Sequence, residues 1–255
     1  MKISATSERR AAGERWIVPD WPTPPTVRSL ITTREGGLSC GVFASFNLGA
    51  HVGDDAAAVA ANRARLLAKV GAPPRWLNQV HGTRVVDATS AAGEPPDADA
   101  AFAREPGAAC VVMTADCLPV LFCDAAGSVV AAAHAGWRGL LAGVLERTIA
   151  AMQVPHADLM AYLGPAIGPQ AFEVGDEVRA AFVESDAHAA AAFTPGAPGK
   201  WLGDLYRLAQ QRLEATGVAR VFGGEYCTYG EADRFFSYRR DGQTGRMASL
   251  IWLAQ

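Results

Sequence analysis

The chain has 255 residues, of which half are hydrophobic and 19% charged, as in a folded globular protein that buries most of its apolar surface. A net charge of −3 gives no basic footprint for nucleic acid, and no apolar run reaches the ~18 residues that a membrane span needs. The first residues lack the apolar core of a secretory signal, and the five cysteines are scattered, so we expect the chain in the reducing cytoplasm. We further expect a monomer that contacts neither nucleic acid nor membrane.

The N-terminal third begins with residues 1–26, which are polar and then Pro-rich (VPDWPTPP), and we expect a loosely held lead-in. A strand is predicted at residues 27–33. A helix is predicted from Asp54 or Asp55 as N-cap to Val70, because apolar residues form one face and Gly71 follows. Short strands are predicted at 76–80 and 84–87, and residues 90–99 read as a surface loop.

A hairpin is predicted in the middle of the chain. Apolar runs at 118–123 and 128–133 flank the sequence DAAG, with Gly127 suited to a positive φ. If pairing is symmetric about this loop, the numbers of opposed residues sum to 251, which sets Cys117 opposite His134. Opposed antiparallel residues share a face with Cβ atoms about 5 Å apart, so we expect this thiol and imidazole to converge.

The C-terminal half alternates predicted helices and strands. Helical spacing is clearest at 140–152, and further helices are predicted at 176–185 and 202–216. Strands are predicted at 159–163, 218–222, 235–238 and 248–253. The lack of a strict βαβ rhythm, together with the central hairpin, favours an α+β fold with a mixed sheet, as a single domain over 27–255.

Three side chains that bind metals stand at predicted strand ends, namely His81, Cys117 and His134, and a glycine follows each histidine within two residues. One Cys and two His form a tetrahedral zinc set with one ligand missing, as in catalytic zinc sites that keep a water. Other interpretations stay open. Cys117 and His134 could be a nucleophile and its base, the set with Met113 as a weak axial ligand could bind copper, or all three residues could be structural.

Several segments resemble the laccase-domain family, known as polyphenol oxidases and purine nucleoside phosphorylases. The segments are TTREGG (32–37), NLGAHVGDD (47–55), NQVHGTRVV (78–86), TADCLPVL (114–121), AAHAGWRGL (132–140), LGPAIGP (163–169), FEVGDEV (172–178) and FFSYRRDGQTGR (235–246). The resemblance implies an α/β/β/α layered sandwich similar to cysteine-type deamidase toxins, and zinc ligands at His81, Cys117 and His134, with copper as the alternative metal.

The implied activity is phosphorolysis of adenosine, inosine and methylthioadenosine to free base and ribose 1-phosphate, with adenosine deamination. Oxidation of phenols is expected to be secondary. The family also includes peptidoglycan editing factors, so an amide hydrolase or cell-wall precursor role is the alternative. The H-x-E and P-C-x-x-C signatures of cytidine-type deaminases are absent, which leaves no obvious glutamate proton shuttle.

Phosphorolysis requires donors that hold phosphate and groups that stabilise charge on the departing base. Arg138 is the first candidate for an anion clamp, since Arg binds phosphate bidentately. The further substrate candidates are Arg34, Asn47, Asp54, Gln79, Arg239 and Arg240; Asn47 and Asp54 are equally well explained as ordering their loop. Asp116 is a candidate proton shuttle or ligand-orienting residue, although in a regular strand it would face away from Cys117. His51, His156 and His188 are expected in loops.

Overall fold

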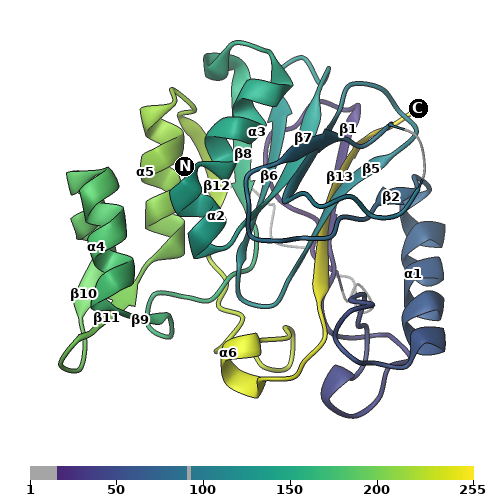
Figure 1. The fold of residues 1–255 in the computed structure, drawn as a ribbon. Coiled ribbons are helices and arrows are strands. Elements are labelled where there is room, and N and C mark those ends of the chain that lie inside the picture. The colour runs from purple at the N-terminus through teal and green to yellow at the C-terminus, as the bar shows by residue number, and fades with distance from the viewer. Residues whose placement is uncertain (1–15, 91–92) are drawn as a thin grey trace, which may run out of the picture.

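In the computed structural model of the chain, residues 16–90 and 93–255 are described. Two mixed sheets face each other (Figure 1). The larger sheet has the order β12 (Arg220–Gly223), β8 (Leu159–Leu163), β6 (Leu118–Asp124), β7 (Val130–Ala135), β4 (Ala100–Ala103) and β3 (Val85–Asp87). The smaller sheet has the order β1 (Val27–Ile31), β13 (Met247–Leu253), β5 (Ala109–Thr114) and β2 (Pro74–Arg75). Parallel pairs occur only at sheet edges, at β12–β8, β4–β3 and β2–β5, and the other pairs in these two sheets are antiparallel.

Helices cover the outer faces of both sheets. In Figure 1, α1 (Ala56–Val70) lies against the smaller sheet, while α2 (Trp137–Ala142), α3 (Val144–Met152) and α5 (Leu205–Ala215) lie on the side of the larger one. Beyond them are α4 (Asp176–Ser185) and a small sheet of β10 (Phe193–Pro195), β11 (Lys200–Gly203) and β9 (Glu173–Gly175). The predicted α+β class and α/β/β/α layering are therefore confirmed.

The centre of the fold is the apolar layer between the two sheets. Leu121 and Cys123 of β6 meet Cys110 and Val112 of β5 there, and all four are fully buried. Both sheets are also covered on their outer faces, so their central strands are apolar on both sides, and the sequence shows continuous apolar runs instead of alternation. Among the described residues, no helix combines the length and hydropathy of a transmembrane segment.

The N-terminal segment 16–26 is packed onto the sheets, contrary to the loosely held lead-in that we expected. Ile17 forms a bridge with Ile31, and Trp21 is buried, with its ring 5.8 Å from that of Tyr162. Residues 1–15 lie outside the described residues. The domain division at residue 26 stays a prediction.

The central hairpin forms, but its predicted register is wrong by two residues. Pro119, not Cys117, is opposite His134. The loop is longer than predicted because the Asp124 carboxylate accepts hydrogen bonds from the Ser128 hydroxyl and amide and from the Val129 amide. A two-residue shift leaves every side chain on its predicted face. Cys117 therefore remains on the side of His134, one residue before β6 begins.

Other predicted elements differ in detail. The helix at 140–152 is two helices, because Gly143 at φ 96° ends α2 and precedes α3. The strands predicted at 76–80 and 235–238 are wrong: the first is a loop with one bridge at Asn78, and the second leads into the short helix α6 (Tyr238–Asp241). Three 3-10 helices, Gly41–Phe43, His156–Asp158 and Ala187–Ala192, complete the described elements.

Candidate metal centre

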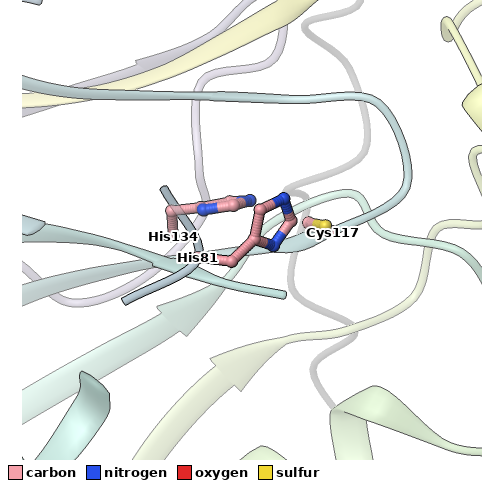
Figure 2. A group of neighbouring side chains, drawn as sticks. All are labelled: His81, Cys117 and His134. Atoms are coloured by element: carbon pink, nitrogen blue, oxygen red, sulfur yellow. The ribbon is translucent and has the colours of Figure 1, made fainter. Parts of the chain in front are cut away.

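His81, Cys117 and His134 converge at one point, each contributing a donor atom within 4.8 Å of the other two (Figure 2). His134 belongs to β7, Cys117 lies just before β6, and His81 lies in the loop before β3. The two imidazole rings meet edge to face, with centroids 4.8 Å apart. Three residues that are distant in sequence thus form one donor set, as their positions at predicted strand ends suggested.

The backbone at this point adopts conformations that are uncommon for residues other than glycine. His81 has φ 59° and Asp116, beside Cys117, has φ 102°. Such residues cluster at functional sites, because the surrounding structure must hold them in place. Asp116 is held by its carboxylate, which accepts hydrogen bonds from the Thr228 hydroxyl and the Arg239 amide, each at 2.6 Å. Asp116 therefore fixes the turn that presents Cys117.

Asp99 connects the two histidines. Its Oδ1 accepts hydrogen bonds from Nδ1 of His134 at 2.8 Å and from the His81 amide at 3.0 Å. Its Oδ2 accepts from the amides of Val80 and Gly82. Asp99 is fully buried, although the sequence interpretation put it in a surface loop. The signal that was missed is its place directly before the apolar run 100–103, where a strand begins.

The electrostatics of the cluster favour a cation. Burial acts to lower the pKa of His134, but the neighbouring Cys117 and the Asp99 carboxylate outweigh it and raise the pKa to about 9. Burial and the neighbouring His134 lower the pKa of His81, so its imidazole is neutral and free to coordinate. Without a metal, His134 therefore holds a proton at neutral pH and balances the charge of Asp99.

The geometry fits a metal ion. Asp99 engages Nδ1 of His134 and leaves Nε2 for coordination, which is the usual way in which a carboxylate orients a ligating histidine. Gly136 leaves room beside the donors, since a Cβ there would lie 2.8 Å from Nδ1 of His81 and 2.9 Å from Sγ of Cys117. Nitrogen and sulfur donors of this kind suit zinc or copper and do not suit magnesium or calcium.

The cluster borders a cavity of about 560 Å³, within the usual range for small-molecule sites. One wall holds the three donors and Met113, and Arg138, Arg239 and Arg246 also line the cavity. Apolar and aromatic side chains complete the lining, among them Phe172 and Tyr238. The cavity is thus lined by a candidate metal-binding set, by cationic hydrogen-bond donors and by apolar side chains.

Residues 28–254 match the family described as multi-copper polyphenol oxidoreductase laccase. The chain belongs to this family. It is 56% identical to a Pseudomonas aeruginosa protein and 55% identical to an Escherichia coli protein, YfiH, both named purine nucleoside phosphorylase; each comparison covers 93% of this chain and 98% of the relative.

Solved structures of the laccase family are also similar. A Neisseria meningitidis protein superposes with a TM-score of 0.94 at 57% identity, covering 95% of this chain and 100% of that one. YlmD from Geobacillus stearothermophilus superposes with a TM-score of 0.85 at 32% identity, covering 91% and 93%.

Four of the polar residues predicted to surround the cluster line the cavity of this laccase-family chain: Gln79, Asp116, Arg138 and Arg239. The Gln79 amide both accepts from and donates to the backbone of Met113, so it ties the His81 loop to β5. Arg138 lies over the Trp137 ring at 4.4 Å, and Arg239 donates to the Glu173 carbonyl. Arg138 and Arg239 both bring guanidinium donors to the cavity, where an anion could accept from them.

The other four predicted substrate residues do not line this cavity. Arg34 donates to the carbonyls of Ala44 and Ala232 and borders a separate, shallower cavity. Arg240 donates to the Thr228, Tyr229 and Phe235 carbonyls. Asn47 is fully buried and donates to Asp54, which favours the interpretation that these two residues order their loop.

Besides Asp99, which holds the histidines but does not line the cavity, the sequence interpretation missed two basic residues that do line it. They are His51, expected only as a loop residue, and Arg246, which was not singled out. Both lie in segments that carry the family resemblance, 47–55 and 235–246, but neither stands beside a recognisable strand end. Their convergence depends on contacts between segments almost 200 residues apart.

Proposed function

We propose that this chain is a zinc-dependent purine nucleoside phosphorylase acting on adenosine, inosine and methylthioadenosine. The observation that carries the proposal is the His81/Cys117/His134 set on the wall of a cavity that also presents arginine side chains. The relatives named purine nucleoside phosphorylase support it at 55–56% identity over 93% of the chain. That name implies a small-molecule substrate, which the cavity volume accommodates.

The nitrogen and sulfur donors favour zinc, with copper as the alternative metal. When bound, the metal would act as a Lewis acid that stabilises negative charge developing on the substrate. Within residues 16–90 and 93–255, the three-residue set is the only group of this kind. That single group supports one metal ion, not the several copper centres in the family's description, so phenol oxidation is proposed as secondary at most.

In phosphorolysis a phosphate oxygen forms a bond to C1′ of the ribose as the glycosidic bond breaks, and the purine leaves with the electron pair and takes up a proton. The arginines of the cavity would bind the phosphate and orient it toward C1′. Asp99, Asp116 and Gln79 would keep the loops that carry the three donors in place. Adenosine deamination, in which water replaces the 6-amino group and ammonia leaves, is proposed as a second reaction in the same cavity.

The direct test incubates the zinc-loaded protein with adenosine and phosphate, and follows adenine, ribose 1-phosphate and inosine by chromatography. We expect all three products, and loss of all of them in His81→Ala. His156→Ala is the matched control, because His156 is exposed and its ring contacts the Thr216 carbonyl away from the cavity. Absence of ribose 1-phosphate at every loading of zinc or copper would contradict the proposal.

A second candidate, an amide hydrolase acting on cell-wall precursors, is favoured by one observation. Cys117, His134 and Asp99 stand in the order nucleophile, base and orienting carboxylate, since donor atoms of Cys117 and His134 lie within 4.8 Å of each other and His134 is hydrogen-bonded to Asp99. Cys117→Ser with zinc supplied in excess separates the two candidates. A thiol nucleophile loses all turnover, whereas a metal ligand loses zinc affinity and regains activity as zinc is added. The monomeric state and cytoplasmic location stay predictions.

A further inference from the structure

Two loops far apart in sequence meet at the edge of the cavity. Arg246 donates its backbone N–H to Oδ1 of the buried Asn47 at 2.9 Å and accepts from the Leu48 amide at 3.2 Å. The side chain of Gln243 donates to the Val52 carbonyl at 3.3 Å. These contacts make one unit of the loops 47–55 and 242–246, and the unit brings His51 and Arg246 to the cavity wall.

The Arg246 side chain is fixed in one orientation. Its Nη1 donates to the carbonyls of Thr244 and Gly245, at 2.9 and 3.0 Å. Its stem passes Gly49 so closely that a Cβ on that glycine would lie 2.8 Å from Cγ of Arg246. Among residues 16–90 and 93–255, the side-chain hydrogen bonds of Arg246 use Nη1 alone, so Nε and Nη2 remain for a ligand. Little rotamer entropy is left to lose when one binds.

Arg246 is a partly buried cation without an acidic partner. It makes no salt bridge within the part of the chain that the structure describes. Burial lowers its pKa, opposed by the nearby Cys117 and Asp116, yet a guanidinium stays charged at neutral pH. A desolvated charge of this kind is costly unless an anion meets it. A zinc ion held by Cys117 and the two histidines would add positive charge near the guanidinium, which would then need an anion still more.

The other arginines of the cavity are less desolvated than Arg246, so an anion is less strongly favoured beside them. Arg138 and Arg239 are both exposed, and Arg239 also lies over the Phe172 ring. His51 is a suitable neighbour for Arg246, because burial, Arg246 and Arg63 lower the pKa of its imidazole. A neutral imidazole donates one hydrogen bond without adding another charge to neutralise.

We propose that Arg246, with His51 beside it, forms the primary subsite for inorganic phosphate in this cavity. The inference rests on the proposed function, since it assigns the co-substrate of that reaction to one place. A tetrahedral oxyanion accepts two parallel hydrogen bonds from one guanidinium, which matches the free Nε and Nη2. Arg138 and Arg239 then act as outer cations that attract phosphate to the cavity.

The test measures binding of inorganic phosphate to the zinc-loaded protein by isothermal titration calorimetry, without nucleoside, and in parallel the KM for phosphate and for inosine. Arg246→Gln is compared with Arg147→Gln, which removes an exposed arginine of α3 away from the cavity. Losing charge-assisted hydrogen bonds weakens phosphate binding about 10- to 100-fold in Arg246→Gln. The KM for phosphate rises in step, the KM for inosine and the zinc content stay unchanged, and Arg147→Gln resembles the parent.

A second variant tests the subsite independently, in case Arg246→Gln does not fold. Gly49→Ala keeps the guanidinium but pushes on its stem, so it weakens phosphate binding in the same direction. Equal phosphate affinity in the parent, Arg246→Gln and Gly49→Ala would overturn the subsite even if phosphorolysis is observed. Phosphate binding that depends on Arg246 in a protein without phosphorolysis would keep the subsite and reject the proposed function. A parent protein that binds no phosphate would overturn both.

Discussion

The carboxylate of Asp99 and the imidazole of His134 form a buried hydrogen bond, 2.8 Å between Oδ1 and Nδ1. The same oxygen accepts from the His81 amide, so one side chain sets the ring of one proposed ligand and the backbone of another. His134 comes from a strand, whereas His81 lies in a loop at a positive φ. Through these two hydrogen bonds Asp99 holds the loop of the more exposed His81 in a fixed position relative to the strand that carries His134.

Asp99→Asn should weaken metal binding. The amide group that replaces one oxygen is a donor, and it would face backbone N–H donors that then lose their acceptor. We expect about a 10- to 100-fold loss of zinc affinity and a loss of about 1–3 kcal/mol in the free energy of unfolding. Chelator competition and urea unfolding measure the two effects.

The control for this variant is Asp97→Asn. Asp97 is exposed in the same loop, and its carboxylate contacts Asn78 instead of a histidine. It should keep the parent zinc affinity. If Asp99→Asn binds zinc as tightly as Asp97→Asn does, Asp99 does not position the ligands.

The sequence was sufficient to predict features that are encoded locally. Helix α1 begins at its Asp55 cap and ends at Gly71, as the cap residues indicated. The ligand set was found because all three residues stand at predicted strand ends and are of types that bind metals. The error in the hairpin register did not affect the predicted site, because a two-residue shift preserves the face on which His134 and Cys117 meet.

Features that depend on tertiary contacts could not be predicted from the sequence alone. The aromatic run at 235–238 looks like a strand, yet Phe235 and Phe236 fill a separate small core and the chain turns into α6. Asn47 looks like a substrate residue because it is polar and begins the segment NLGAHVGDD, but it is buried against the Arg246 loop. Its partner is 199 residues away in sequence.

Metal affinity should rise with pH. In the metal-free protein the pKa of His134 lies near 9, above its ordinary 6.5, because the effects of Cys117 and Asp99 exceed that of burial. At neutral pH the ligating nitrogen therefore holds a proton that zinc must displace. The apparent affinity should rise about tenfold per pH unit for each displaced proton, and this contribution should level off above about pH 9. Competition with a chelator of known pH dependence, between pH 6.5 and 9.5, measures the slope; a flat profile would show that His134 is unprotonated before zinc binds.

The metal-free protein should lose stability over the same range. A group whose pKa is higher in the folded state stabilises it fully below the unfolded pKa, here 6.5, and this contribution disappears as pH rises through about 9. Zinc-loaded protein should lack this loss, because the metal replaces the proton. Urea unfolding of both forms at pH 7 and pH 9.5 compares them; equal losses in the two forms would contradict the assignment to His134.

Trp21→Ala tests whether the segment 16–26 is part of the domain. Trp21 is 8% exposed, lies in the apolar layer between the sheets and donates to the Ser29 hydroxyl. Its removal should lower the free energy of unfolding by about 3–5 kcal/mol. Val18→Ala is the control, since Val18 is 62% exposed and should change stability by less than about 0.5 kcal/mol. Equal stability of the two variants would mean that the segment contributes nothing to the fold.

Gly136→Ala should weaken metal binding and leave the fold intact. The backbone of Gly136, at φ −61° as N-cap of α2, is accessible to alanine. The new methyl group would lie 2.8 Å from Nδ1 of His81 and 2.9 Å from Sγ of Cys117, in the space between the donors. We expect roughly a tenfold or greater loss of zinc affinity, because crowding forces side chains from their positions. Gly82→Ala is the matched control in the same site, since its nearest neighbour would be 3.5 Å away. Elemental analysis and thermal unfolding of both variants check the prediction, and equal zinc content in the two would show that the donors do not share one ion.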